Sequence, residues 1–223
     1  MVDLSDWVQP FWKPAGWSSF DVIRALRRTT GVRKIGHAGT LDPFATGVLV
    51  LLFGRATKRS AELMDHDKTY LADVLLGQQT NTLDPTGKVD LTRPVPALDE
   101  AGIRAALDGF IGSVDQVPPM FSALRWGGQR LYHLAREGQS VELQSRAVQI
   151  DAITLTGWQP PDRFSISVTC GKGTYIRALA RDIAAALGTV GHLTALTRTR
   201  VGPYSKEQAV QINELEQWIP IEA

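Results

Sequence analysis

Hydrophobic residues recur along the chain at both helical and strand-like spacings. Residues 20–30 are predicted to form a helix, because Val22, Ile23 and Leu26 fall on one face and the arginines on the other. Ser18 or Ser19 can cap the start of this helix, and Gly31 ends it. The unbroken apolar run 48–53 predicts a buried strand. Further helices are predicted at 56–63, 98–110, 129–136 and 174–187, and further strands at 69–76, 141–143, 148–155 and 164–170.

Three polar or irregular stretches separate these elements. Residues 78–96 are predicted to form a long surface loop, and residues 116–128 an aromatic-rich loop around Pro118-Pro119. Residues 193–204 suggest an extended segment followed by a turn. Because strands and helices do not alternate regularly, the pattern favours an α+β fold over a parallel sheet.

The composition of the 223 residues is that of an ordinary globular protein, with 43% hydrophobic and 21% charged residues. The longest apolar run, 48–53, is too short to span a membrane, and the first residues do not resemble a secretory signal. The single cysteine, Cys170, fits a reducing cytoplasm, where we expect the protein to be located. Four scattered histidines lack the spacing of a zinc site.

The net charge is only +1, but the charges are unevenly distributed. Residues 22–41 carry five basic side chains and no acid, and residues 163–205 carry six basic side chains and one acid, Asp182. Two such basic blocks suggest a face that binds a polyanion such as RNA. The alternative is that the arginines lie on solvated helix surfaces.

The most distinctive segment is 36–47, Gly-His-Ala-Gly-Thr-Leu-Asp-Pro-Phe-Ala-Thr-Gly. Its only acid, Asp42, follows a basic run and precedes the predicted strand 48–53. A carboxylate on such a shaped loop is a candidate nucleophile or general base. The alternative is a turn stabilised by an Asx hydrogen bond.

Two other segments carry candidate chemistry. Tyr70 opens a predicted strand, and its ring and hydroxyl can stack on a base and move a proton, although ordinary packing is the alternative. Arg177 follows a glycine turn in the first turn of a predicted helix, and beside Asp42 it would keep that carboxylate ionised. The alternative for this turn is phosphate binding, although 171–174 lacks the spacing of an ATP-binding loop.

Taken together, these segments resemble the TruB-type tRNA pseudouridine synthases. The resemblance covers nearly the whole chain, from about residue 11 to 204, and the Gly-His-Ala-Gly-Thr-Leu-Asp-Pro string is specific by itself. The matching motifs lie at 13–19, 34–43, 68–70, 117–123, 173–177 and 196–203.

The resemblance implies an α+β catalytic domain with a mixed, largely antiparallel sheet and RNA bound across a basic cleft. It implies isomerisation of uridine to pseudouridine in the T loop of tRNA, at uridine-55, without a metal or organic cofactor. The tRNA T-arm is the expected partner, with no membrane and no obligate protein partner. Residues 1–205 would form the catalytic domain, and 206–223 a short C-terminal segment rather than a full PUA-type RNA-binding domain.

The resemblance also assigns residue roles. Asp42 would be the catalytic aspartate, Tyr70 would stack on the base and take part in removing the C5 proton, and Arg177 would pair with Asp42. His37 would stack on flipped nucleotides, Lys13 and Pro14 would support the loop, and Leu196 would wall the pocket. Tyr175, Arg198 and the segment 118–146 would face the RNA or form the pocket. Asn81 departs from the family pattern, which often has aspartate between the two threonines of 80–82.

This chemistry requires the uridine to be flipped out of the loop, at a cost of about a few kcal/mol, which stacking on side chains offsets. Asp42 could attack C1′ or remove a C2′ proton, and the sequence leaves both routes open. Two other readings of the chain are an RNA chaperone without turnover and the catalytic subunit of a guide-RNA particle. The short N-terminus and the absence of basic tails favour the stand-alone enzyme.

Overall fold

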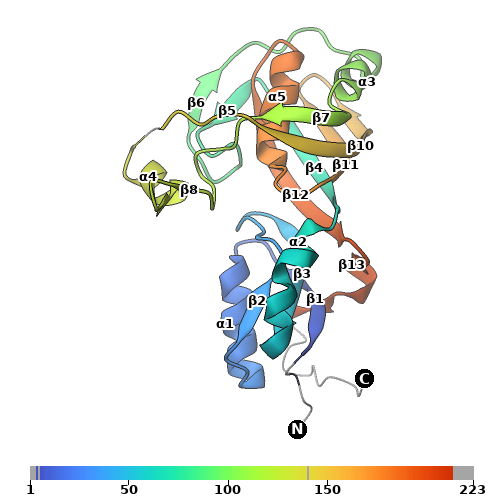
Figure 1. Cartoon of the computed structure of the whole chain (residues 1–223). Helices are drawn as coiled ribbons and strands as arrows, with labels where there is room; N and C mark the ends of the chain where they lie inside the picture. Colours follow the sequence, from blue (N-terminus) through green and yellow to red (C-terminus); the bar gives the residue numbers. More distant parts are fainter. Residues whose placement is uncertain (1–3, 5, 140, 213–223) are drawn as a thin grey trace. The chain divides into compact units, whose positions relative to one another are not determined.

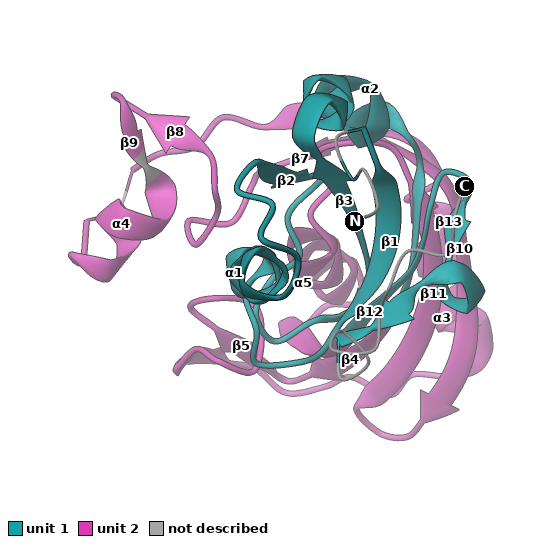
Figure 2. Ribbon diagram, turned by 90° about the horizontal axis from the view of Figure 1, so that it is seen from below, with its two compact units in different colours: residues 1–71, 196–223 teal, residues 72–195 magenta. Residues whose placement is uncertain are grey.

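The computed structural model describes residues 4, 6–139 and 141–212. The chain divides into two compact units, residues 1–71 with 196–223 (unit 1) and residues 72–195 (unit 2), as coloured in Figure 2. Strands β4 (Lys68–Leu76) and β12 (Gly191–Val201) each run from one unit into the other. Most helices and strands of both units are labelled in Figure 1.

Unit 1 contains strands in the order β14-β1-β3-β12. Strand β1 (Val8–Lys13) pairs antiparallel with β3 (Thr46–Phe53) and parallel with β14 (Val210–Gln211). Strand β3 also pairs in parallel with β12, with Thr46 opposite Thr197. The remaining elements are β2 (Ile35–His37), β13 (Tyr204–Ser205), helices α1 (Ser19–Thr30) and α2 (Ser60–Asp65), and the 3-10 helices η1 (Gly54–Arg59) and η2 (Lys206–Gln208).

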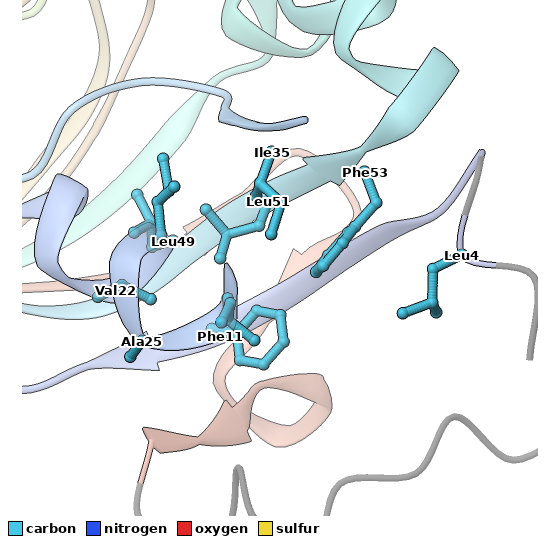
Figure 3. Close-up of a cluster of buried hydrophobic side chains, with 10 residues drawn as sticks. Leu4, Phe11, Val22, Ala25, Ile35, Leu49, Leu51 and Phe53 are labelled. Carbon is cyan, nitrogen blue, oxygen red and sulfur yellow. The ribbon is translucent and has the colours of Figure 1, made fainter. Parts of the chain in front are cut away.

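Strand β3 is buried on both faces, which explains its unbroken apolar sequence. Leu49, Leu51 and Phe53 point into a core with α1 and β1, and Figure 3 shows them beside Phe11. The alternate residues Val48, Val50 and Leu52 enter a second core with Leu63 and Val201. A strand covered on both sides has no need of alternating polar residues, so the run 48–53 marks the centre of unit 1.

Helix α1 begins and ends at local sequence signals. The Ser18 hydroxyl accepts from the Asp21 amide and the Asp21 carboxylate accepts from the Ser18 amide, which makes a capping box. Gly31 adopts a left-handed conformation with φ of 72° at the C-terminal end. Val22, Ile23 and Leu26 are buried, as the predicted apolar face requires.

Unit 2 contains strands in the order β4-β11-β10-β7. Strand β10 (Arg146–Gln159) pairs antiparallel with both β11 (Arg163–Cys170) and β7 (Gly112–Gln116). Helix α3 (Glu100–Asp108) contacts β10 and α5 (Ile176–Ala186). Two small hairpins, β5 (Gln78–Thr80) with β6 (Val89–Thr92) and β8 (Arg125–Trp126) with β9 (Gln129–Arg130), and helix α4 (Leu131–Arg136) complete the unit.

The predicted α+β class and the mixed, largely antiparallel sheet are confirmed. Local predictions differ from the structure in four places. Residues 141–143 form no strand, and the predicted loops 78–96 and 116–128 contain the β5-β6 hairpin and strand β8. The predicted helix 129–136 is present but begins only at Leu131, after strand β9. Strand β1 was not predicted, because Pro10 and the polar Gln9 and Lys13 obscure its strand pattern.

Two further properties concern the described residues alone. In this part of the chain, the helices are all too short or too polar to cross a membrane. The described side chains also include no group of three or more His, Cys, Asp or Glu arranged to hold a metal ion.

Leu51→Ala should lower the free energy of unfolding by about 2–5 kcal/mol, because the fully buried side chain leaves a cavity in the core of unit 1. Leu71→Ala is the matched control, because Leu71 is 46% exposed and should change stability by less than about 0.5 kcal/mol. Urea denaturation of both variants checks this. Equal losses of stability would contradict the double-sided burial of β3.

Candidate active site

The loop that carries Asp42 is held by the buried side chain of Arg198. Arg198 is 1% exposed. Its Nε donates to the carbonyl of Val48, which follows Asp42 in the chain, at 2.8 Å. Its Nη1 and Nη2 donate to the carbonyls of Thr40 and Gly39, at 3.3 Å and 3.1 Å. One guanidinium thus joins the backbone before Asp42 to the backbone after it.

Lys13 holds the same loop from strand β1. Its ammonium group, on a residue with no exposed surface, donates to the carbonyls of Trp17 at 2.6 Å, Pro14 at 2.9 Å and Pro43 at 3.3 Å. The Pro43 contact reaches the residue directly after Asp42. An ammonium has three hydrogens, and each finds a carbonyl here.

Ser19 and Gly47 fix the two ends of the loop. The Leu41 amide donates to Ser19 Oγ at 2.9 Å, and Ser19 Oγ donates to the Leu41 carbonyl at 3.2 Å, so the first turn of α1 is tied to the residue before Asp42. Gly47 has a φ of 120°, and a Cβ there would lie 2.2 Å from the Arg198 carbonyl oxygen. Only glycine fits this close approach.

Electrostatics in this part of unit 1 are dominated by the two buried cations. Burial, together with the Arg198 charge, lowers the pKa of Lys13 to about 8, although the Asp42 carboxylate opposes this shift. Burial and the Arg198 charge also lower the pKa of His37, which favours the neutral imidazole. His37 Nδ1 is buried and has no hydrogen-bond partner among the described residues. The Asp42 carboxylate lies close enough to Lys13 for their charges to interact.

The other predicted site residues of unit 1 lie in β4, in β12 and directly after β1. Tyr70, in β4, is 8% exposed, and the Thr69 carbonyl next to it accepts a hydrogen bond from the Thr199 hydroxyl at 3.2 Å. Leu196 is buried in β12, two residues before Arg198. Pro14 is half-buried and follows Lys13. Seven predicted residues thus belong to unit 1: Lys13, Pro14, His37, Asp42, Tyr70, Leu196 and Arg198.

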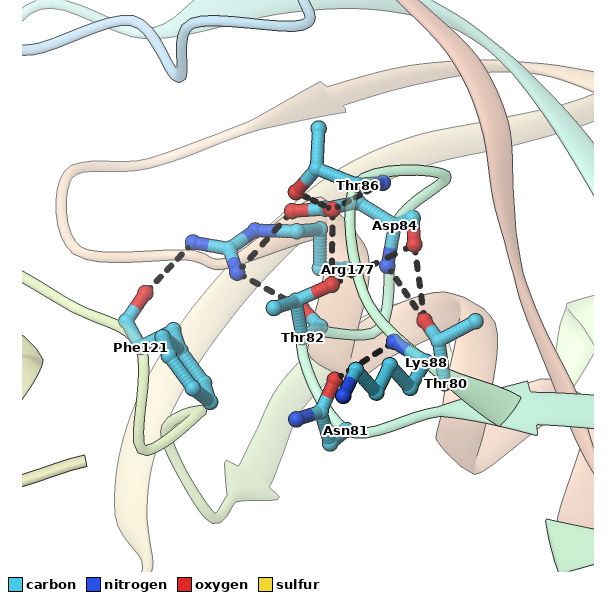
Figure 4. A network of polar contacts seen from close by, with 8 residues as sticks. All are labelled: Thr80, Asn81, Thr82, Asp84, Thr86, Lys88, Phe121 and Arg177. Carbon is cyan, nitrogen blue, oxygen red and sulfur yellow. Dashed lines mark hydrogen bonds and ion pairs between the residues drawn. The ribbon is translucent and has the colours of Figure 1, made fainter. Parts of the chain in front are cut away.

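Arg177 lies in unit 2, where it takes part in a buried polar network (Figure 4). Its side chain is 3% exposed, and Nη1 lies 3.4 Å from Asp84 Oδ2 and donates to the Thr82 carbonyl at 2.7 Å. Nη2 donates to the Phe121 carbonyl at 2.8 Å. The guanidinium therefore joins helix α5, the β5-β6 turn and the loop that follows β7. The predicted pairing of Arg177 with Asp42 concerns residues of different units and stays a prediction.

Asp84 was not identified as a site residue from the sequence. Its Oδ1 accepts from the Thr82 hydroxyl at 2.7 Å and from the amide and hydroxyl of Thr86, at 2.9 Å and 2.5 Å. These bonds turn Oδ2 towards Arg177. The sequence feature that could have identified it is the Thr-Asn-Thr-Leu-Asp string of residues 80–84, in which Asp84 follows the two threonines that flank Asn81.

Asn81 itself has a local structural role. Its Oδ1 accepts from the Lys88 amide at 3.0 Å across the β5-β6 turn, and the residue is exposed (Figure 4). A carboxylate oxygen could accept the same bond, so the amide preserves the turn. Tyr175 precedes α5, and its amide and carbonyl bond the buried Gln116 side chain at 2.8 Å and 3.2 Å. The Arg146 guanidinium lies 5.2 Å from the Tyr175 ring centre.

Comparison with protein-family models assigns the chain to a family. Residues 27–176 match the model of the TruB family pseudouridylate synthase N-terminal domain. The chain belongs to the TruB family of pseudouridylate synthases. Residues 177–222 match the tRNA pseudouridylate synthase B C-terminal domain. The family consists of isomerases, so the enzyme class expected from the sequence is confirmed.

Relatives of the TruB family match most of this chain. It is 49% identical over 210 residues to a tRNA pseudouridine synthase B of Thermobifida fusca (strain YX), covering 91% of this chain and 72% of that one. It is 50% identical over 204 residues to the protein of that name from Burkholderia pseudomallei (strain 668), covering 92% and 67%. A solved chain of a Cbf5-Nop10-Gar1 complex is similar with a TM-score of 0.75 and 26% identity, covering 96% of this chain and 55% of that one.

The lowered pKa of Lys13 makes its contribution to stability dependent on pH. Between about pH 8 and 10.5, the unfolded chain keeps a proton on Lys13 that the folded protein has released. The free energy of unfolding therefore increases as the pH rises through this range. The stability difference between wild type and Lys13→Met should shift by about 1–3 kcal/mol in favour of wild type between pH 7 and pH 10. Urea denaturation at both pH values measures it, and parallel pH profiles would contradict it.

Asp84→Ala should lower the free energy of unfolding by about 3 kcal/mol or more, because it removes the Asp84 carboxylate from the buried Arg177 guanidinium. Asn81→Ala is the control, because it removes an exposed contact of the same turn and should cost about 1 kcal/mol or less. Denaturation curves compare the two variants. A loss for Asp84→Ala no larger than that for Asn81→Ala would show that the pair does not stabilise the fold.

Proposed function

We propose that this protein isomerises uridine to pseudouridine in tRNA, at uridine-55 of the T loop. The observation that carries the proposal is the Asp42 loop, an acidic residue on a backbone fixed by the buried cations Lys13 and Arg198. The family membership and the roughly half-identical relatives named tRNA pseudouridine synthase B support the substrate.

The reaction needs no atoms beyond those of the substrate. The N1–C1′ bond breaks, the detached uracil turns, and a new bond forms between C5 and C1′. The C5 proton is then lost, and N1 gains a proton. An enzyme for this reaction must supply an ionised carboxylate near the ribose, a proton acceptor near C5 and a pocket that holds the detached base.

Asp42 is the group that we propose acts at the ribose, either by attack on C1′ or by removal of the C2′ proton. Both routes require the carboxylate rather than the acid, and the Asp42 charge interacts with that of the Lys13 ammonium. Tyr70 would stack on the uracil and assist removal of the C5 proton, with Leu196 as a pocket wall. Neutral His37 would stack on a flipped nucleotide.

Arg177 is the residue that we propose connects Asp42 to the rest of the site. The Asp84 contact and the two backbone carbonyls fix its guanidinium, so an ion pair with Asp42 would be formed by a preorganised group. Lys13, Pro14 and Arg198 would then act through the backbone of the Asp42 loop rather than by touching RNA.

We propose that the segment 118–146 binds the T-arm of tRNA. Its exposed side chains include Arg125, Trp126 (49% exposed) and Tyr132, with the Arg136 guanidinium 4.5 Å from the Tyr132 ring centre. Aromatic rings beside arginines suit unpaired bases and phosphates. Tyr175 beside Arg146 would extend the same surface.

A guide-RNA particle is the second candidate, because the similar solved chain belongs to a Cbf5-Nop10-Gar1 complex. The identity of 26% to that chain, against 49–50% to the tRNA enzymes, favours tRNA as the substrate. We therefore propose a stand-alone enzyme without cofactor, with residues 1–205 as its catalytic domain. The single, buried Cys170 is in keeping with the cytoplasm, where tRNA is modified.

Asp42→Asn should abolish pseudouridine formation while the dissociation constant for tRNA changes by less than about tenfold. The amide has a similar shape but cannot act as a nucleophile or base. Pseudouridine mapping on an unmodified tRNA transcript, with a filter-binding assay alongside, measures both effects. Asp115→Asn, which alters an exposed carboxylate of β7, should retain full activity.

Two outcomes would count against the proposal. Turnover by Asp42→Asn would remove Asp42 from its assigned role. Absence of product from the wild type, with tight binding retained, would favour the guide-RNA or chaperone reading.

A further inference from the structure

Helix α1 presents a basic outer face that neither the fold nor the proposed catalytic chemistry uses. Its inner residues Val22, Ile23 and Leu26 are buried against the core of unit 1 (Figure 3 shows Val22). The opposite face carries four exposed residues at spacings of four, three and one along the helix. These residues, the α1 outer face, are Phe20, Arg24, Arg27 and Arg28.

Phe20 is the unusual member of this face. It is 52% exposed, although a phenylalanine at a helix surface gains nothing from contact with water. The Arg24 and Arg27 guanidinium groups lie 5.5 Å and 5.6 Å from its ring centre. The ring therefore holds two charged groups on the surface without neutralising either of them.

The acid next to this face, Asp21, compensates its positive charge only in part. Asp21 lies 3.3 Å from Arg24, but its carboxylate also accepts from the amide and hydroxyl of Ser18 in the capping box. The side chain of Arg24 stays 60% exposed, and Arg33 and Lys34 extend the exposed positive charge beyond the helix. Such a surface suits a partner that is itself a row of negative charges.

The position of α1 beside the Asp42 loop indicates that the polyanion bound by the α1 outer face is the substrate RNA. Phe20 follows Ser19, whose hydroxyl is bonded to both the amide and the carbonyl of Leu41, the residue before Asp42. The basic face thus starts one residue from a direct contact with the proposed catalytic loop. RNA whose uridine reaches Asp42 has further phosphates on either side of that nucleotide, and a helix anchored here is placed to meet them.

We propose that the α1 outer face binds the phosphodiester backbone of the substrate RNA next to the modified uridine. Arg27 and Arg28 contact phosphates, and Phe20 orients the guanidinium groups of Arg24 and Arg27 for the same purpose. This inference rests on the proposed function, because it takes tRNA as the substrate. The face contributes to affinity and leaves the chemical step unchanged.

The test compares the double variant Arg27→Gln/Arg28→Gln with wild type, using an unmodified tRNA transcript. Glutamine retains helix propensity, so α1 should remain folded, as circular dichroism can verify. The dissociation constant and KM should rise about tenfold or more with kcat within twofold. The slope of log affinity against log salt should fall in magnitude by about 1–2. Phe20→Leu, which removes the aromatic ring, should weaken binding several-fold.

Arg104→Gln/Arg163→Gln is the control, because it removes two exposed arginines of unit 2 and the same formal charge. Its affinity, KM and salt slope should stay within twofold of wild type. If both double variants weaken binding equally, general charge and not the α1 outer face is responsible.

The two proposals fail in different ways. A wild-type protein that neither binds nor modifies tRNA would overturn the proposed function. A wild type that forms pseudouridine, beside an α1 variant with unchanged KM and salt slope, would overturn only the role of the α1 outer face. Loss of self-association by that variant, with RNA affinity intact, would assign the face to a second copy of the chain and also overturn the inference.

Discussion

The Asp42 loop depends on two buried cations whose hydrogens go to backbone carbonyls. Burying an ammonium or guanidinium group costs about several kcal/mol unless its donors are satisfied. Lys13 and Arg198 meet that condition with carbonyls of Pro14, Trp17, Pro43, Gly39, Thr40 and Val48. The contacts that make their burial tolerable are the same contacts that fix the loop. Shape and positive potential around Asp42 therefore have one origin.

A similar principle operates in unit 2. The Arg177 guanidinium is also buried, and it also uses backbone carbonyls, those of Thr82 and Phe121, beside the Asp84 carboxylate. Asp84 in turn is oriented by hydroxyl and amide donors on a single oxygen. Arginine suits such positions because its planar group offers five donors in fixed directions. Each unit thus contains buried cationic side chains whose orientation is fixed by hydrogen bonds to backbone carbonyls.

The sequence predicted best what local signals determine. Helix α1 has a serine cap, an apolar stripe and a terminal glycine within thirteen residues, and β3 is an uninterrupted apolar run. From the resemblance, Arg198 was expected to face the RNA or to form the pocket, and its contacts with the backbone of the Asp42 loop could not be predicted. Its buried position depends on carbonyls about 150 residues away in the chain, and spacing along a sequence carries no information on such contacts. Asp84 was missed for the same reason.

The preformed loop also bears on how RNA binding energy is used. Because folding already fixes the backbone around Asp42, contacts with RNA do not have to order it. In the proposed reaction, binding energy from phosphates, including those proposed to lie along α1, is then available to unstack and flip the uridine. Helix α1 is suited to this division, since its inner face is packed into the core and Ser19 ties it to Leu41. In this proposal, the outer face of α1 contributes to affinity for RNA, while Ser19 at the start of the same helix holds the loop of the proposed catalytic Asp42.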